Sequence, residues 1–386
     1  MFKRISSIDV FRAITMVLMI FVNDFWSLSG IPLWLEHAGA TEDFLGFSDI
    51  IFPCFLFIVG MSIPYAIRNR ISKGETNFRI LSHILLRSAA LLVMGFFTVN
   101  VSDLNEAASG ISSQWFQILM VAGFFLIWNV YPKVQDWKKY LFIGLQFIGG
   151  LILIALFSTF RGGEQGLAHM SPQWWGILGL IGWTYLISAS IYLFIHKSTL
   201  LILGSWLLFT LLNIATQKGW IHNSYIPGGG AYQGFAFAGM AAALLLDWAI
   251  NPEKRKKLPF IYLGIGILLL IGGFALRNIF IISKIQGTPT WVFLCNAIAF
   301  GVLALTYFLV DLKGKVHWFD AIKPAGTSTL TCYLVPYIYY SLATYAFTLP
   351  LWMKTGALGL VKSFVYALII VGITALLGKM KIRLKI

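Results

Sequence analysis

The sequence predicts an all-α, polytopic membrane protein with about twelve transmembrane helices, in the range of roughly ten to twelve. Of its 386 residues, 58% are hydrophobic and only 11% are charged, and the mean hydropathy is +0.80. This composition leaves too little polar surface to coat a water-soluble protein. Apolar runs of about 18 to 24 residues recur along the chain, each long enough to cross a hydrocarbon core of ~30 Å as a helix. The short alternating strands of a membrane barrel do not occur.

The apolar runs set the positions of the expected helices. We expect helices at 10–27, 48–67, 80–99, 114–131, 140–159, 174–195, 199–216, 233–250, 259–282, 290–310, 326–347 and 358–378. Only the segment His196 to Ser198 separates the sixth helix from the seventh. No internal repeat, low-complexity segment or long linker divides the chain, so residues 1–386 are expected to form a single transmembrane domain.

The basic residues predict the orientation in the membrane. The net charge is +14, but Lys and Arg lie in short segments between apolar runs, which indicates topology rather than nucleic-acid binding. With a cytoplasmic N-terminus, 23 of the 29 basic residues fall on the cytoplasmic side. Both termini are therefore expected in the cytoplasm, with His37 on the outer side and Arg12 and Arg87 on the inner side.

The three cysteines do not indicate a metal or a disulfide framework. Cys54, Cys295 and Cys332 all lie in apolar runs, without the paired spacing that either would need. No cluster of His, Cys and carboxylate residues has ligand spacing, so no metal is expected.

On the outer side, His37 is the strongest candidate for chemistry. It follows Glu36 in a polar loop and precedes Asp49 by twelve positions, where the chain re-enters the membrane. An imidazole suits proton transfer near neutral pH, and a carboxylate can fix its tautomer. Asn23 and Asp24 end the first span on the same side; an amide there can hold a substrate hydroxyl or polarise a carbonyl, or simply cap a helix end.

On the inner side, the first helix begins with polar residues that have two interpretations. Ser7 and Asp9 are typical of a helix N-terminus. Arg12 lies one turn inside the apolar run, where it can pair with Asp9 or bind a phosphate. Arg68 and Arg87 belong to a second basic group that either obeys the positive-inside rule or supplies counter-charge to a polyphosphate.

Four segments between Arg4 and Ser62 resemble a known family. They are Arg4-Ile5-Ser6-Ser7-Ile8-Asp9-Val10-Phe11-Arg12-Ala13, Met19 to Asn23, Glu36-His37-Ala38, and Asp49-Ile50-Ile51-Phe52-Pro53 through Ser62. In order and spacing they resemble the catalytic core of heparan-α-glucosaminide N-acetyltransferase and its bacterial relatives in the transmembrane acyltransferase superfamily. Weaker similarity runs through Arg87, Lys284 to Trp291, and Gly326 to Tyr333.

The resemblance implies a transmembrane acetyltransferase in the inner membrane of a bacterium. Acetyl-CoA would bind from the cytoplasm, and its acetyl group would pass to an amino sugar of the glucosamine type on the outer face. His37 would be the active-site residue, with Asp49 and Asn23 close to it. The residues expected to bind acetyl-CoA are Arg12, Arg87, Ser7, Asp9 and Arg68, and those expected to contact the acceptor are Glu36, Asp24 and Lys284.

Several alternatives stay open on the sequence. His37 can act as a general base or as a transient acetyl acceptor. The catalytic core is expected at 4–100, and an additional helix pair within 140–216 replaces a long loop of the family, so the acceptor's identity is open. An O-acyltransferase of cell-envelope polysaccharide and a small-solute transporter are the rival functions, and a binding or scaffold role is the third. Expected partners are acetyl-CoA, the amino sugar and membrane lipids, with no nucleic acid; relatives form dimers, so a homodimer is one expectation.

Overall fold

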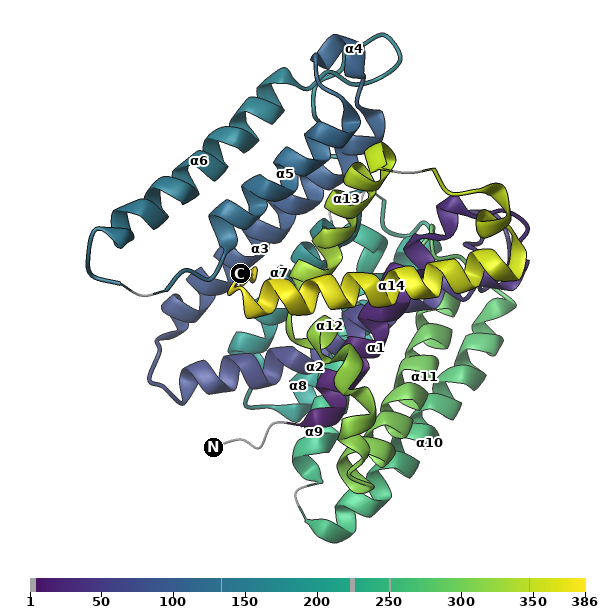
Figure 1. Cartoon of the computed structure of the whole chain (residues 1–386). Coiled ribbons are helices and arrows are strands. Elements are labelled where there is room, and N and C mark those ends of the chain that lie inside the picture. Colours follow the sequence, from purple (N-terminus) through teal and green to yellow (C-terminus); the bar gives the residue numbers. More distant parts are fainter. Residues whose placement is uncertain (1–4, 133, 223–225, 250, 347) are drawn as a thin grey trace.

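The computed structural model describes residues 5–132, 134–222, 226–249, 251–346 and 348–386. These residues form a bundle of helices without any multi-residue strand (Figure 1), which confirms the all-α prediction. The helices are α1 (Ser6–Asn23), α2 (Ser48–Ile71), α3 (Asn77–Asn100), α4 (Glu106–Ser109), α5 (Ser113–Trp128), α6 (Lys138–Thr159), α7 (Gly176–Ile195), α8 (Thr199–Gln217), α9 (Ala231–Trp248), α10 (Pro252–Arg277), α11 (Pro289–Thr306), α12 (Lys323–Thr327), α13 (Thr329–Ala346) and α14 (Gly356–Lys379).

Nine helices of the described chain are long and apolar enough to cross a membrane, and α5 is a shorter apolar helix. The chain is therefore a multi-pass membrane protein. Each of the twelve expected helices has a counterpart. The expected helix at 326–347 is broken at Ser328, where the backbone leaves the helical region, and the helix at 290–310 continues as a π-helical turn, Tyr307–Leu312. Residues 250 and 347, at which two of the expected helices end, lie outside the described residues, as does Arg4.

The first and last long helices lie side by side in opposite directions. The segment after α1 pairs with the segment before α14 through a bridge between Ser29 and Thr355. The start of α1 and the end of α14 therefore lie toward the same end of the bundle (Figure 1). We call that end, where Arg12 lies, the Arg12 end, and the opposite end, with the 24–47 loop, the His37 end. Which end faces the cytoplasm stays a prediction.

Close packing against α9 fixes the position of α2. Gly60 of α2 faces the carbonyl oxygen of Ala236, and Gly239 of α9 faces that of Phe57, so closely that a Cβ atom at either glycine would overlap the facing oxygen. Small residues at such contacts let two membrane helices approach with their backbones touching. Helix α2, which carries Asp49 in its first turn, is thereby held against α9 around Phe57 and Gly60.

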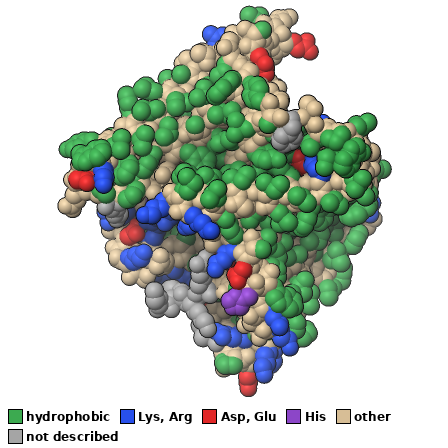
Figure 2. All heavy atoms as spheres, in the orientation of Figure 1, with side chains coloured by type: hydrophobic (Ala, Val, Ile, Leu, Met, Phe, Trp, Pro, Cys, Tyr) green, Lys and Arg blue, Asp and Glu red, His purple; other side chains and the backbone are tan. Residues whose placement is uncertain are grey.

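The outer surface of the bundle is apolar, as a lipid-facing surface requires. Phe147 and Ile154 of α6, and Leu268 and Ile271 of α10, are among its exposed apolar side chains. Figure 2 shows hydrophobic atoms over a broad part of one face, with Lys and Arg gathered toward its lower part. The buried side chains form clusters between the helices, so polar groups inside the bundle stand out as candidates for function.

Candidate active site

The loop that carries His37 is folded back onto the start of α2. The Phe47 N–H donates to the Trp34 carbonyl (2.8 Å), and the Ser48 hydroxyl donates to the Leu35 carbonyl (2.6 Å). Gly46 lies so close to the carbonyl oxygen of Glu36 that a Cβ atom there would overlap it. These contacts hold the residue that follows Glu36, which is His37, above the first turn of the helix.

At that position His37 and Asp49 form a hydrogen-bonded pair. His37 Nδ1 lies 2.7 Å from Asp49 Oδ1. The other carboxylate oxygen, Oδ2, accepts the backbone N–H groups of Ala38 (3.0 Å) and Gly46 (3.3 Å). Asp49 is 2% exposed, whereas the His37 ring is 52% exposed. Because an ionised carboxylate only accepts hydrogen bonds, we assign the ring proton to Nδ1, which leaves a lone pair on Nε2.

A lysine completes the cluster from a distant part of the chain. Lys284 Nζ lies 3.5 Å from Asp49 Oδ1 and 3.2 Å from His37 Nδ1. Burial lowers the pKa of Lys284, and the negative charge of Asp49 opposes that shift. The ammonium group therefore balances the charge of a carboxylate that is almost fully enclosed.

The loop that carries Lys284 is tied to the loop that carries His37. The carbonyl of Ala40 accepts hydrogen bonds from the Ser283 hydroxyl (2.9 Å) and the Gln286 side-chain amide (2.7 Å). Asp43 accepts the N–H of Ile282 (2.8 Å) and the guanidinium of Arg277 (2.8 Å). The backbone hydrogen bond from Ile282, with a further contribution from Arg277, lowers the pKa of Asp43 against the opposing effect of burial.

Trp291 fixes the backbone beneath the cluster, and sequence reasoning gave it no role. Its indole N–H donates to the carbonyl of Asp49 (3.1 Å), and its side chain is fully buried. The resembling segment from Lys284 to Trp291 was the available signal, because its two ends turn out to contact the same aspartate.

The N-terminal part of the chain matches the family described as heparan-alpha-glucosaminide N-acetyltransferase, catalytic, over residues 4–105. A human protein named heparan-alpha-glucosaminide N-acetyltransferase is 37% identical over 98 residues, which are 25% of this chain and 14% of that protein. The mouse protein of the same name is 33% identical over 99 residues, with the same shares. This part of the chain is related to that family. The match thus spans about one seventh of the curated relatives' length.

The matched segment contains His37, Asp49, Asn23, Arg12 and Arg87, whereas Lys284 lies outside it. The structure therefore joins the matched segment to a later part of the chain at the histidine. Among the residues that the structure describes, no group of three or more His, Cys, Asp or Glu side chains is placed to hold a metal ion.

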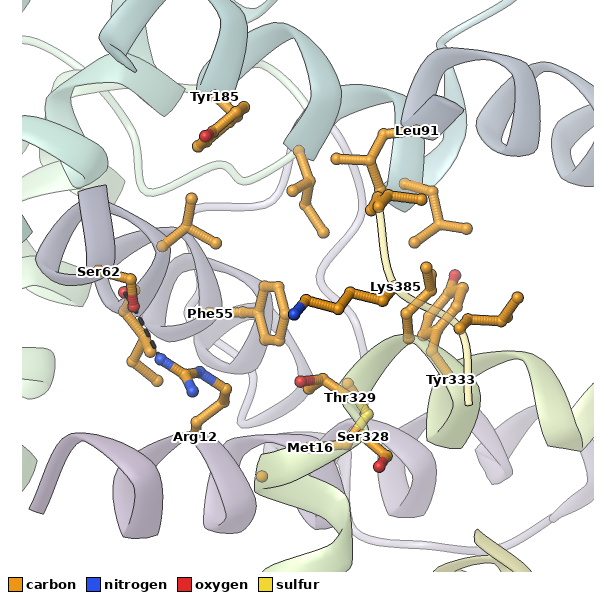
Figure 3. A pocket seen from close by; sticks show the side chains of 18 of the residues that line it. Arg12, Met16, Phe55, Ser62, Leu91, Tyr185, Ser328, Thr329, Tyr333 and Lys385 are labelled. Atoms are coloured by element: carbon orange, nitrogen blue, oxygen red, sulfur yellow. Dashed lines mark hydrogen bonds between the residues drawn. The ribbon is translucent and has the colours of Figure 1, made fainter. Parts of the chain in front are cut away.

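At the Arg12 end, a cavity of about 420 Å³ opens between α1, α2, α3, α7 and the start of α13 (Figure 3). Arg12 lies on its wall, paired with Asp9 (3.2 Å) and donating to the Ser62 hydroxyl (2.7 Å). Arg87 stacks over the Tyr185 ring, with its guanidinium carbon 4.7 Å from the ring centroid. We call this space the Arg12 cavity.

The Arg12 cavity is suited to an anionic ligand. Lys385 points into it beside Phe55 (Figure 3), so the described side chains on the wall include three cations, Arg12, Arg87 and Lys385, and one carboxylate, that of Asp9. Among the described residues, Arg87 Nε is buried without a hydrogen-bond partner. Ser328 and Thr329, at the break between α12 and α13, add hydroxyl groups. The residues present therefore fit a phosphate-bearing molecule, with an apolar interior around Met16 for its uncharged part.

Two residues expected to bind acetyl-CoA lie away from this cavity. Arg68 pairs with Asp247 of α9 (2.6 Å) and stacks over Tyr65. Ser7 is buried, and its backbone N–H donates to Asp311 (3.0 Å), so a carboxylate from another element satisfies the start of α1. Neither is among the residues that line the cavity.

Asp24 and Glu36, the other residues expected to contact the acceptor, lie in different surroundings. Asp24 is 1% exposed and accepts from Tyr340, Ser363 and Lys362, the last at 2.6 Å. Its carboxylate therefore links α1 to α13 and α14 inside the protein. Glu36 is half-buried, and its backbone carbonyl packs against Gly46.

Asn23 lines a second cavity, of about 600 Å³, at the His37 end. We call it the Asn23 cavity. Tyr333 lines both this space and the Arg12 cavity, whereas His37 is among the described lining residues of neither. The structure therefore brings His37 to Asp49 and Lys284, but it does not place the imidazole on the wall of the cavity that holds Arg12.

Proposed function

We propose that this chain is a membrane-embedded acetyltransferase that moves an acetyl group from cytoplasmic acetyl-CoA to an amino sugar on the opposite face. The observation that carries this proposal is the His37–Asp49 pair, built within the segment related to an N-acetyltransferase catalytic region. A buried carboxylate that orients a half-exposed imidazole is an arrangement suited to proton transfer. The location that we propose is the inner membrane of a bacterium, with the His37 end outside, in keeping with the basic segments at the Arg12 end.

In this proposal His37 acts as the general base. The acceptor nitrogen attacks the thioester carbonyl carbon, the C–N bond forms, the C–S bond breaks, and the amine proton passes to His37 Nε2. Asp49 holds the ring through Nδ1 (2.7 Å) and stabilises the imidazolium that results. The departing thiolate then takes up a proton. Base assistance of this kind contributes about 10²- to 10⁴-fold to the rate.

Nucleophilic participation by His37 is the alternative route. The same lone pair on Nε2 can attack the thioester carbon, which gives an acetyl-imidazole and free thiolate before the amine arrives. Single-turnover mixing with acetyl-CoA and no acceptor distinguishes the two routes. Acetyl transfer to His37 under those conditions supports the covalent route, and thiol release that strictly requires the amine supports general-base transfer.

The donor side of the proposal rests on the Arg12 cavity. Arg12, Arg87 and Lys385 provide positive charge for the phosphates of acetyl-CoA at the Arg12 end. The apolar residues that line the cavity, such as Met16 and Ile181, suit the uncharged arm that ends in the thioester. For the acetyl group to reach the His37 end, the wall formed by Tyr333 has to open, and the Tyr333 ring is thus part of the proposed path.

The function is tested by thiol release from acetyl-CoA in the presence of glucosamine, with protein in lipid nanodiscs. We expect His37→Ala to lose at least about 10²-fold in rate, while His169→Ala, which changes an exposed histidine at residues 160–175, keeps the parent rate. Equal rates for the parent and His37→Ala would reject the assigned role.

Two cavities in line through a membrane bundle also favour one rival, a small-solute transporter. In sealed vesicles a transporter accumulates the sugar without consuming acetyl-CoA. The acetyltransferase instead releases thiol on the Arg12 side in step with N-acetylation on the His37 side. An O-acyltransferase is distinguished by the product, because ester bonds are cleaved by hydroxylamine and amides are not.

A further inference from the structure

The Asn23 cavity lies at the end of α1, in line with the Arg12 cavity. α1 contributes Arg12, Met16 and Met19 to the first cavity and Ile20 and Asn23 to the second. Arg12 and Asn23 are eleven positions apart, a rise of about 16 Å along a helix. The second cavity therefore opens at the same end of the bundle as the loop that carries His37.

The wall of the Asn23 cavity is polar but uncharged. Among the described residues that line it, none is Asp, Glu, Lys, Arg or His. Two of its amide side chains, Asn23 and Gln114, make no hydrogen bond within the described part of the chain. Each therefore presents both a donor and an acceptor to whatever fills the space.

The hydroxyl groups on the wall are arranged to accept hydrogen bonds. Ser102, Ser341 and Thr344 each donate to a carbonyl of their own helix or its preceding turn, at 2.8 to 3.1 Å. Since each hydroxyl proton is engaged, the remaining lone pairs are free to accept from a ligand. A ligand with several hydroxyl donors matches this wall.

Aromatic rings form the other part of the wall. The Trp26 side chain is 74% exposed, and its ring lies 5.5 Å from that of Tyr340, with Tyr337 and Tyr366 nearby on the wall. Aromatic faces bind the weakly polar C–H face of a sugar ring by dispersion, while amides and hydroxyls hold its edge. An acyl chain would leave the amides of Asn23 and Gln114 unsatisfied.

We propose that the Asn23 cavity binds an uncharged sugar ring, and that in the reaction proposed above it is the subsite that holds the ring of the acceptor. Because His37 is not among the described residues that line this cavity, the acceptor amine has to meet the imidazole beyond the cavity wall. Binding of the sugar stands on the cavity alone; only its role as acceptor rests on the proposed function. A sulfated or carboxylated sugar finds no counter-charge on the wall. An ammonium finds no available carboxylate either, because Lys362, Ser363 and Tyr340 already contact Asp24. The cavity therefore selects the free-amine form of an amino sugar, which is the nucleophilic form.

Equilibrium binding without acetyl-CoA tests the subsite. Nanodiscs are needed because maltoside detergents carry sugar head groups. The probes are radiolabelled N-acetylglucosamine and radiolabelled methyl glucoside, with a sulfated glucosamine disaccharide as competitor. We expect saturable binding of both probes and no competition by the sulfated sugar. Trp26→Leu and Gln114→Leu are each expected to weaken binding by about tenfold or more.

Matched controls on exposed positions outside the cavity are Trp115→Leu on α5 and Gln146→Leu on α6, and both should bind as the parent does. Unchanged binding in the Trp26 and Gln114 variants, equal competition by the sulfated disaccharide, or the absence of saturable sugar binding would each overturn the proposal. Variants are compared at equal monodisperse yield, and Gln114→Asn, which keeps the amide, should bind more tightly than Gln114→Leu.

The acceptor role has a separate readout. If His37→Ala binds the sugar normally but transfers no acetyl group, both the subsite and the proposed function are supported. If sugar binds in the cavity while thiol release is unaffected by His37→Ala, the proposed function fails and the binding site stands. If the cavity variants lose binding but keep the parent KM for glucosamine, the binding site stands and its acceptor role fails.

Discussion

Lys284 Nζ lies 3.2 Å from Nδ1 of His37, although 247 positions separate the two residues in the chain. The same ammonium group lies 3.5 Å from Asp49 Oδ1, so it faces the hydrogen bond between the imidazole and the carboxylate. The sequence suggested a substrate contact for Lys284. Its position instead indicates a positioning residue that acts through the histidine and the aspartate.

We expect Lys284→Met to lower kcat by about 10- to 100-fold, the usual effect of removing a group that orients a functional histidine. KM for acetyl-CoA should change little, because the Arg12 cavity is not affected. Lys284→Arg restores the positive charge and should recover part of the rate. A Met variant with parent kcat would show that the ammonium group has no part in the reaction.

The pH dependence follows from the lowered pKa of Lys284. Because burial favours the neutral amine, the ammonium is lost at a lower pH than in a free lysine, and activity should fall as the pH rises through this folded-state pKa. Arginine stays protonated throughout, so Lys284→Arg should move the alkaline limb of kcat to higher pH. The free energy of unfolding depends on the same lowered pKa. The contribution of Lys284 to this free energy is complete above the pKa that the lysine has in the unfolded chain, and it is lost as the pH falls through the lower pKa of the folded state. An alkaline limb at the same pH in both proteins would assign it to another group.

Gly46→Ala tests the close packing of the His37 loop. The added methyl group would overlap the carbonyl oxygen of Glu36, so the loop has to move and the contacts around Asp49 loosen. We expect a loss of activity of about 10²-fold, as for small displacements of catalytic groups, with the helical content unchanged. Gly144→Ala on α6 has nothing within contact distance of the new methyl group and serves as the control. Parent activity in Gly46→Ala would mean that the loop geometry does not matter for the reaction.

Arg87→Gln tests the Arg12 cavity as the donor site. The variant removes a cation whose Nε has no partner among the described residues. KM for acetyl-CoA should rise by about tenfold, the effect of one charge-assisted hydrogen bond to phosphate, with a smaller change in kcat. Arg79→Gln, on an exposed position of the same helix, should leave KM unchanged. Equal KM values for acetyl-CoA in the two variants would remove Arg87 from the site.

The helices could be predicted because the length of an apolar run is set by the thickness of the membrane. The breaks within the helices could not be predicted in this way. The break at Ser328 follows the short helix α12, which packs closely on α1, where Gly326 faces the Asp9 carbonyl. Such an interruption depends on the neighbouring helix rather than on local composition.

The His37–Asp49 pair was predictable because both residues lie in one segment, and the resemblance joined them. Lys284 and Trp291 reach the pair from a loop and helix more than 230 positions later, a contact that depends on packing. Asn23 and Asp24 show that neighbouring positions in the sequence do not predict a shared environment. Although they are adjacent, one side chain faces a cavity and the other is enclosed, because consecutive residues at a helix end point in different directions.

The buried pair of Asp24 and Lys362 gives the last prediction. Asp24 is 1% exposed and Lys362 15%, and their side chains are 2.6 Å apart. Lys362→Met leaves the carboxylate enclosed with only neutral donors, which should destabilise the protein by about 3–5 kcal/mol. Thermal denaturation in nanodiscs is the measurement, and Lys197→Met, at an exposed position between α7 and α8, is the control.

The double variant Asp24→Asn with Lys362→Met separates the two causes of that loss. If the loss comes from an unpaired buried charge, removing the charge as well should recover part of the stability, so the double variant melts above Lys362→Met alone. If the loss comes only from packing of the lysine side chain, the double variant melts at or below the single variant. Since Tyr340 also donates to Asp24, the neutral amide keeps an oxygen for that hydroxyl, and the wall of the Asn23 cavity should stay in place.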